Sequence, residues 1–203
     1  MKKAIETLME EHRLIERVLG SLETFACEME SGGSAPRETL SGYAEFFSNF
    51  ADKCHHGKEE DRLFALMAQN GFPTEHGPIG VMLADHQEGR GHVKALAALA
   101  GGSGPWSGEE RIEAVRQARD YISMLRSHII KEDNILYPMA LQAIKGEQMD
   151  QLAESFEAFE HEVMGAGAHE RFHALAERLV AAYPPDPEKM EAMPACTGCS
   201  GHA

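Results

Sequence analysis

Long hydrophobic runs are missing from this sequence. No stretch is long and apolar enough to cross a membrane as a helix. The N-terminal residues include acids and a histidine within the first twelve positions, so they lack the apolar segment of a secretory signal. We therefore expect a soluble cytoplasmic protein that does not bind membranes.

Basic residues are also scarce. Lys and Arg number 19 against 33 for Asp and Glu, which gives a formal net charge of −14. Such a charge repels the phosphates of nucleic acids and the head groups of anionic lipids. Neither nucleic acid nor a membrane is therefore expected as a partner.

Disulfide frameworks and β-strand patterns are absent as well. The four cysteines are irregularly spaced in a chain of 203 residues, unlike those of a small secreted domain, so we expect free thiols. Alternating β-branched runs do not occur, whereas apolar residues recur with helical period along nearly the whole chain. The sequence therefore predicts an all-α fold.

Breaks rich in Gly and Pro divide this helical pattern at residues 31–36, 70–73 and 101–105. A fourth helix is predicted from about residue 107 to 144, and a fifth from about 147 to 183 with an interruption at 165–167. Short connections favour antiparallel neighbours. We predict an up-down-up-down four-helix bundle over residues 1–145, an additional C-terminal helix packed outside it over 146–183, and a Pro-rich tail over 184–203.

The most informative feature is an internal repeat. Residues 54–64 and 127–137 each contain a His followed four residues later by a Glu, with Lys, a second acid and a Leu-aromatic pair at matching offsets. On a helix, positions i and i+4 lie on one face, so each segment directs an imidazole and a carboxylate to the same point. Two such pairs indicate two metal ions.

Ionisable residues also occupy the predicted core stripes. His12 in the first helix and His86 in the third replace apolar residues in stripes that step by three and four positions. Aligned in a bundle, the stripes bring six side chains to one layer: His12, His55, Glu59, His86, His128 and Glu132.

Six ionisable groups in a core layer need compensation, because burying each unpaired charge costs several kcal/mol. A mixture of imidazole and carboxylate suits iron, zinc or manganese better than calcium or magnesium. In the simplest pseudo-twofold arrangement the first two helices supply His12, His55 and Glu59, and the next two supply His86, His128 and Glu132. Open or water-filled positions then remain at the metals.

The order His, His-x-x-x-Glu, His, His-x-x-x-Glu over four helices resembles the hemerythrin-like (HHE cation-binding) domains over about residues 1–145. The resemblance implies a non-haem centre of two iron ions, bridged by two carboxylates and an oxygen species (oxo or hydroxo). It also implies a function with dioxygen, peroxide or nitric oxide as the small ligand, in binding, sensing, redox turnover or repair of iron centres. Binding or sensing of dioxygen or a related oxidant is our leading hypothesis.

The choice of ligands depends on the register of the repeat, and the sequence departs from respiratory hemerythrins at two positions. His56 and Glu60 also form an i, i+4 pair, but alignment of the repeats favours His55 and Glu59, with His56 and Glu60 as flanking residues. Respiratory hemerythrins carry a second His four residues after the third-helix ligand, where this chain has Arg90. The last carboxylate ligand of respiratory hemerythrins corresponds in position to Asp133 of this chain, whereas the internal repeat favours Glu132 as the ligand. These departures shift weight from reversible oxygen carriage towards redox reactivity or sensing, and the sequence leaves open whether the protein is an enzyme.

Other features carry weaker signals. Arg90 is a candidate either for support of a ligand or for a surface salt bridge, and Gly89 either leaves room for a small molecule near the site or makes a helix-packing contact. Tyr43, Tyr121 and Tyr137 are expected to pack in the core. A further metal site is conceivable at His161, His169 and His173, although these histidines flank the apolar stripe of the fifth helix. Cys196 and Cys199 form a C-x-x-C pair that would let the tail engage a protein client in redox or metal transfer.

Overall fold

The computed structural model describes residues 2–187, and within this range it contains helices and loops but no strand. None of the described helices is both long enough and apolar enough to cross a membrane. The elements in chain order are α1 (Lys3–Glu30), α2 (Arg37–Phe46), η1 (Phe47–His56), η2 (Glu59–Phe64), α3 (Ala65–Gln69), α4 (Gly77–Ala100), α5 (Gly108–Lys131), η3 (Glu132–Leu136), α6 (Tyr137–Ala143), α7 (Gly146–Met164) and α8 (Ala168–Ala182).

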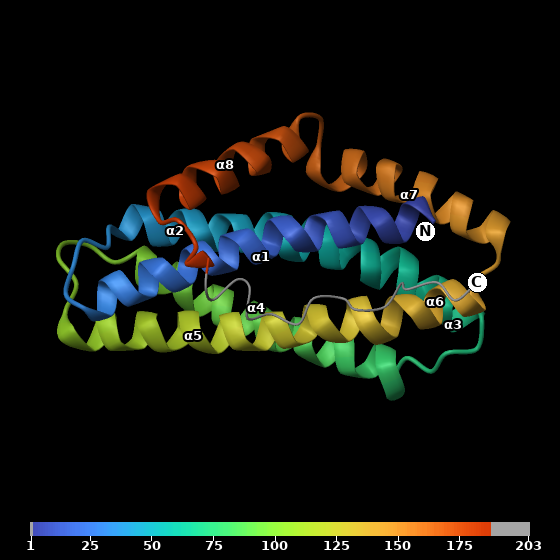
Figure 1. Cartoon of the computed structure of the whole chain (residues 1–203), viewed down its shortest axis with the longest axis horizontal. Helices are drawn as coiled ribbons and strands as arrows, with labels where there is room; N and C mark the ends of the chain where they lie inside the picture. Colours follow the sequence, from blue (N-terminus) through green and yellow to red (C-terminus); the bar gives the residue numbers. More distant parts are fainter. Residues whose placement is uncertain (1, 188–203) are drawn as a thin grey trace.

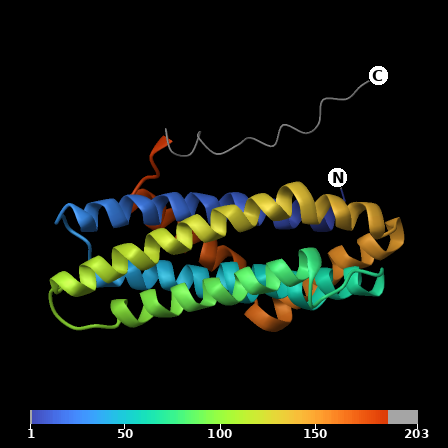
Figure 2. The same ribbon diagram turned by 90° about the horizontal axis from the view of Figure 1, so that it is seen from below.

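Four long helical segments lie side by side along the long axis of the molecule (Figures 1 and 2). The first segment is α1 and the third is α4. The second is the continuous helical run from α2 to α3, and the fourth is the continuous run from α5 to α6. The loops between successive segments lie at opposite ends of this axis (Figure 1). The prediction of an all-α helical bundle is confirmed.

The helix ends follow the breaks in the sequence. α1 ends at Glu30, α3 at Gln69 and α4 at Ala100, each directly before a predicted Gly- and Pro-rich connection. α5 begins with a capping box, in which the Ser107 hydroxyl accepts from the Glu110 backbone N–H and the Glu110 carboxylate accepts from that of Ser107.

The helices are not uniform, which the sequence pattern did not reveal. The two repeated His-x-x-x-Glu segments contain π-helical stretches, η1 and η2 in the first and η3 in the second. A π-helix is wider than an α-helix because its hydrogen bonds run from residue i to i+5, and such stretches are frequent at functional sites. A π-helical turn holds more residues than an α-helical turn, so consecutive side chains project at a smaller angle to each other.

Two apolar clusters fill the interior, one towards each end of the bundle. One includes Ile15, Leu19 and Phe47, and the other includes Ile5, Leu8 and Leu136. His12 lies on α1 between Leu8 and Ile15, at the junction of the two clusters. A polar layer therefore interrupts an otherwise apolar core.

The last two helices cover one side of the bundle (Figure 1). α7 contacts α1 and η1, and α8 contacts α1 and α2. Gly57 permits the close approach of α7, because a Cβ atom at this position would lie 2.6 Å from the ring of Phe159. The helix is interrupted at residues 165–167, as the sequence predicts, where Gly165 and Gly167 adopt positive φ values of 80° and 76°.

Candidate metal centre

The six side chains expected to bind metal lie together in one buried layer. Their exposure is at most 1% each. Each comes from a different element: His12 from α1, His55 from η1, Glu59 from η2, His86 from α4, His128 from α5 and Glu132 from η3.

The histidines form two pairs whose Nε2 atoms converge. The Nε2 atoms of His12 and His55 are 2.9 Å apart, and those of His86 and His128 are 3.1 Å apart. Two imidazole nitrogens that bind one ion at about 2.1 Å and at a right angle to each other lie about 3 Å apart. Each pair therefore has the spacing of two ligands on a single ion.

The two carboxylates each span both pairs. Glu59 Oε2 lies 3.7 Å from Nε2 of His55 and 3.6 Å from Nε2 of His86. Glu132 Oε2 lies 3.2 Å from Nε2 of His12 and 3.1 Å from Nε2 of His128. Each carboxylate thus faces one histidine from each half of the bundle, which is the position that a bridging ligand occupies.

Carboxylates hold the outer side of the four rings. The Nδ1 atom of each ring lies within 3.2 Å of a carboxylate oxygen, in the pairs His12–Asp133 (2.8 Å), His55–Glu11 (2.8 Å), His86–Glu60 (2.6 Å) and His128–Asp85 (3.2 Å). An ionised carboxylate only accepts hydrogen bonds, so Nδ1 carries the proton and donates it. In the neutral ring the Nε2 lone pair then points into the centre, which is the form that binds a metal.

A basic side chain neutralises each supporting carboxylate. Arg90 donates to Glu60 at 2.7 Å, and the remaining contacts are Arg13 with Asp133, Lys58 with Glu11 and Lys131 with Asp85. Arg90 thus holds the carboxylate that contacts His86. The supports add no net charge around the centre.

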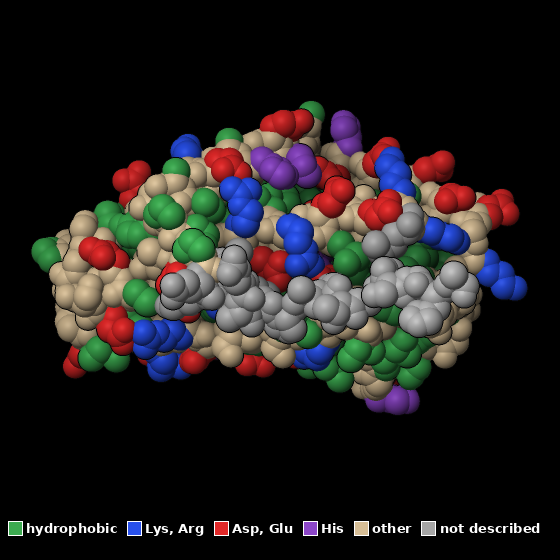
Figure 3. Space-filling model, in the orientation of Figure 1, with side chains coloured by type: hydrophobic (Ala, Val, Ile, Leu, Met, Phe, Trp, Pro, Cys, Tyr) green, Lys and Arg blue, Asp and Glu red, His purple; other side chains and the backbone are tan. Residues whose placement is uncertain are grey.

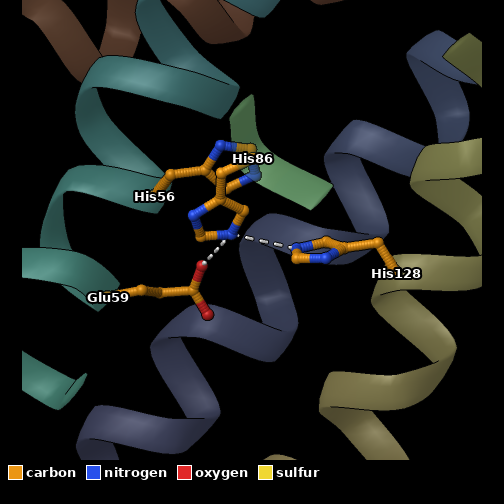
Figure 4. Close-up of side chains that lie close together, drawn as sticks. All are labelled: His56, Glu59, His86 and His128. Atoms are coloured by element: carbon orange, nitrogen blue, oxygen red, sulfur yellow. Dashed lines mark hydrogen bonds and ion pairs between the residues drawn. The ribbon is translucent and has the colours of Figure 1, made fainter. Parts of the chain in front are cut away.

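His56 lies inside the site, although the sequence prediction treated it as a flanking residue. Its ring stacks on that of His86 with centroids 3.8 Å apart, and it groups with Glu59, His86 and His128 at metal-binding distance (Figure 4). Its Nδ1 atom lies 3.5 Å from Asp52, which Arg90 holds. The π-helical widening of η1 explains why two consecutive histidines both turn inwards.

Glu60 and Tyr137 also differ in role from simple flanking or packing residues. Glu60 is partly exposed and supports His86 from behind, while Glu59 is fully buried in the layer. The Tyr137 hydroxyl donates to Glu59 Oε1 at 2.7 Å and lies 3.3 Å from Nε2 of His12. Tyr137 aligns with Phe64 in the internal repeat, so nothing in the pattern distinguished it from a core aromatic.

The centre has uncompensated oxygens that fit a cation. Glu59 Oε2 and both oxygens of Glu132 are buried, and none has a hydrogen-bond partner among the described residues. Burial, followed by the charge of Glu132, raises the pKa of Glu59 well above its usual value. Burial lowers the pKa of His128, but the nearby carboxylates of Glu132 and Asp85 outweigh it and raise that pKa to about 9. Protons therefore occupy the centre at neutral pH in the absence of metal, and a cation would displace them.

Other candidates from the sequence lie elsewhere. Tyr43 hydrogen-bonds Ser21, and Tyr121 packs on Phe47. His169 and His173 lie on α8, with rings 4.4 Å apart, outside the buried layer. Cys196 and Cys199 fall outside the described residues.

Asp85→Asn tests the supporting carboxylates. The change removes the charge that holds the Nδ1 proton of His128, so we expect metal affinity to fall about 10- to 100-fold. Glu88→Gln on the same helix is the matched control, since Glu88 is largely exposed. Dissociation constants from competition with a chelator provide the measurement, and equal constants for the two variants would contradict the role of Asp85.

Glu59→Gln tests the pKa of the buried carboxyl group. The folded-state pKa of Glu59 lies above the unfolded value of about 4.5, so its contribution to stability is present at lower pH and is lost as the pH rises. Without metal, the melting temperature of the wild-type protein should therefore fall relative to that of Glu59→Gln between pH 5 and pH 8. A difference in melting temperature that does not change with pH would show that Glu59 is ionised.

Comparison with known proteins gives one family. Three curated relatives, uncharacterized proteins of Mycobacterium bovis and of two strains of Mycobacterium tuberculosis, are each 25% identical over 162 residues, which is 80% of this chain. The chain spans 63% of the length of these relatives. No solved structure matches significantly.

The model of the hemerythrin HHE cation binding domain matches residues 3–140. This range contains every side chain of the buried layer described above, while α7 and α8 lie beyond it. The chain therefore belongs to the hemerythrin HHE cation-binding family.

Proposed function

We propose that the protein holds two iron ions in the buried layer and binds or senses dioxygen or a related small oxidant there. The observation that supports this most strongly is the pair of buried carboxylates, each facing imidazoles from both halves of the bundle without a hydrogen-bond donor for its free oxygens. A set of imidazoles and carboxylates with open positions suits non-haem iron. The order of the helices is that of an up-down-up-down bundle, in which each half supplies one side of the centre.

The two ions would have unequal ligand sets. His12 and His55 would hold one ion, and His56, His86 and His128 the other, with Glu59 common to both groups and Glu132 facing His12 and His128. The ion with two histidines would have more positions open for a ligand. When bound, iron at this centre supplies the electrons for binding or reducing an oxidant, and the supporting carboxylates keep the imidazole rings in place.

A hollow gives small molecules a route towards the centre. It has a volume of about 260 Å³, and its lining includes Phe47, His56, Gly89, Arg90 and Tyr121. A Cβ atom on Gly89 would lie 3.0 Å from Met124 and 3.5 Å from Tyr121, so a side chain here would crowd the hollow beside its aromatic wall. A small uncharged oxidant would therefore meet His56 first.

An enzyme acting on peroxide or nitric oxide is the second candidate. Tyr137 favours it, because its hydroxyl group lies at the centre and donates to Glu59. Reduction of peroxide to water, or of nitric oxide to nitrous oxide, consumes protons together with electrons from an added reductant, and a phenol at hydrogen-bond distance from the centre can supply a proton. In that case iron-loaded protein consumes the substrate catalytically, and the Tyr137→Phe variant does so more slowly while retaining its iron.

The function is tested by metal content and an absorption spectrum. We expect about two irons per chain in protein purified without chelator, and an oxygen-dependent visible band that disappears when oxygen is removed from the solution. Irreversible oxidation of two bound irons would support the oxidant-consuming alternative. Zinc alone, or no metal after supply of ferrous iron, would contradict the proposal.

The double substitution Glu59→Ala and Glu132→Ala should abolish binding of two irons while the protein stays helical. The matched control is Glu10→Ala with Asp61→Ala, two exposed acids on α1 and η2. Iron analysis and far-ultraviolet circular dichroism make the comparison. Retention of two irons by the first double variant would show that the bridging positions are assigned to the wrong residues.

A further inference from the structure

Histidine and acidic side chains also gather at the surface where α7 meets α8 (Figure 3). This segment lies outside the residues that match the family model. His169 and His173 are one turn apart on α8, and Glu160 faces them from α7. None of these residues contributes to the buried centre.

His169 contacts both of the other side chains. The His169 and His173 rings have centroids 4.4 Å apart, and Glu160 Oε1 lies 3.2 Å from Nδ1 of His169. A hollow of about 290 Å³ adjoins Glu160 and His169, and its lining also includes Glu157, His161 and Glu170. Imidazoles and carboxylates from two helices thus surround one open space.

The protein fixes this arrangement. Gly165 and Gly167, with positive φ angles, form the bend between α7 and α8, and His169 at the start of α8 lies opposite Glu160 near the end of α7. The ring of Phe50 lies beneath, with centroids 6.2 Å from His169 and 6.0 Å from His173. Burial, followed by the proximity of His169, lowers the pKa of His173, which favours the neutral imidazole that binds metal.

We propose that Glu160, His169 and His173 form a second cation site that binds a divalent transition-metal ion such as Zn²⁺. Two imidazoles separated by one helical turn and one carboxylate form a three-ligand set that leaves a position for water. Glu157 and Glu170 around the adjoining hollow add negative potential that attracts a cation. The site shares no ligand with the buried centre, and it is linked to it through the 3.8 Å contact of Glu160 Oε2 with Nζ of Lys58, which holds Glu11.

Zinc titration of the full-length protein, after loading with iron and removal of excess metal, tests the proposal. We expect the double variant His169→Ala with His173→Ala to bind about one Zn²⁺ fewer per chain than the wild type. The control is His92→Ala, since His92 lies on α4 with Glu88 four residues before it but without a second imidazole one turn away. Any zinc bound by the cysteine tail is the same in all three proteins and cancels in the comparison.

Equal numbers of Zn²⁺ ions in the wild type and the double variant would overturn the proposal and leave an ordinary ion pair between His169 and Glu160. Nuclear magnetic resonance of the wild-type histidine rings gives an independent answer that needs no variant to fold. The signals of His169 and His173 should shift together at the first equivalent of added zinc, and unshifted signals would also overturn the proposal. Iron content should be unchanged in the double variant, so failure of this site and failure of the di-iron proposal are distinguishable.

Discussion

Seven titratable side chains are buried away from water in this protein, and the rest of the structure depends on how their charges are compensated. Five imidazoles and two carboxylates share one cross-section of the bundle, between apolar clusters that exclude solvent on both sides. Charged groups in such a place are tolerated only when they are paired or bound to metal. The supporting carboxylates contact the outer Nδ1 atoms of four of the rings. The inward-facing Nε2 atoms and the free carboxylate oxygens remain available to a cation.

The two halves of the bundle solve this problem in the same way. The acid before the first histidine of each half, Glu11 or Asp85, supports the second histidine of that half and is held by the lysine before the buried glutamate. The acid after each buried glutamate, Glu60 or Asp133, supports a histidine of the opposite half. Neither half therefore contains a complete set of supports, and the centre depends on their association.

The sequence predicted the larger features because they have local signals. Gly- and Pro-rich breaks marked the helix ends, and His12 and His86 revealed the polar layer because they interrupt apolar stripes. The inward turn of His56 could not be predicted, because it depends on π-helical hydrogen bonding that leaves the residue pattern unchanged. The carboxylates that support the histidine rings could not be predicted either, because a contact such as His12 with Asp133 depends on how helices distant in sequence pack together.

The ring of supports also bears on how the sequence can change over evolutionary time. Each supporting acid and its basic partner form a neutral unit, and loss of one member leaves a charge beside a metal ligand. A substitution at one position of a unit is then tolerated best when its partner changes as well. Descendants of this chain should show correlated replacement at four pairs of positions: 11 with 58, 85 with 131, 60 with 90, and 13 with 133.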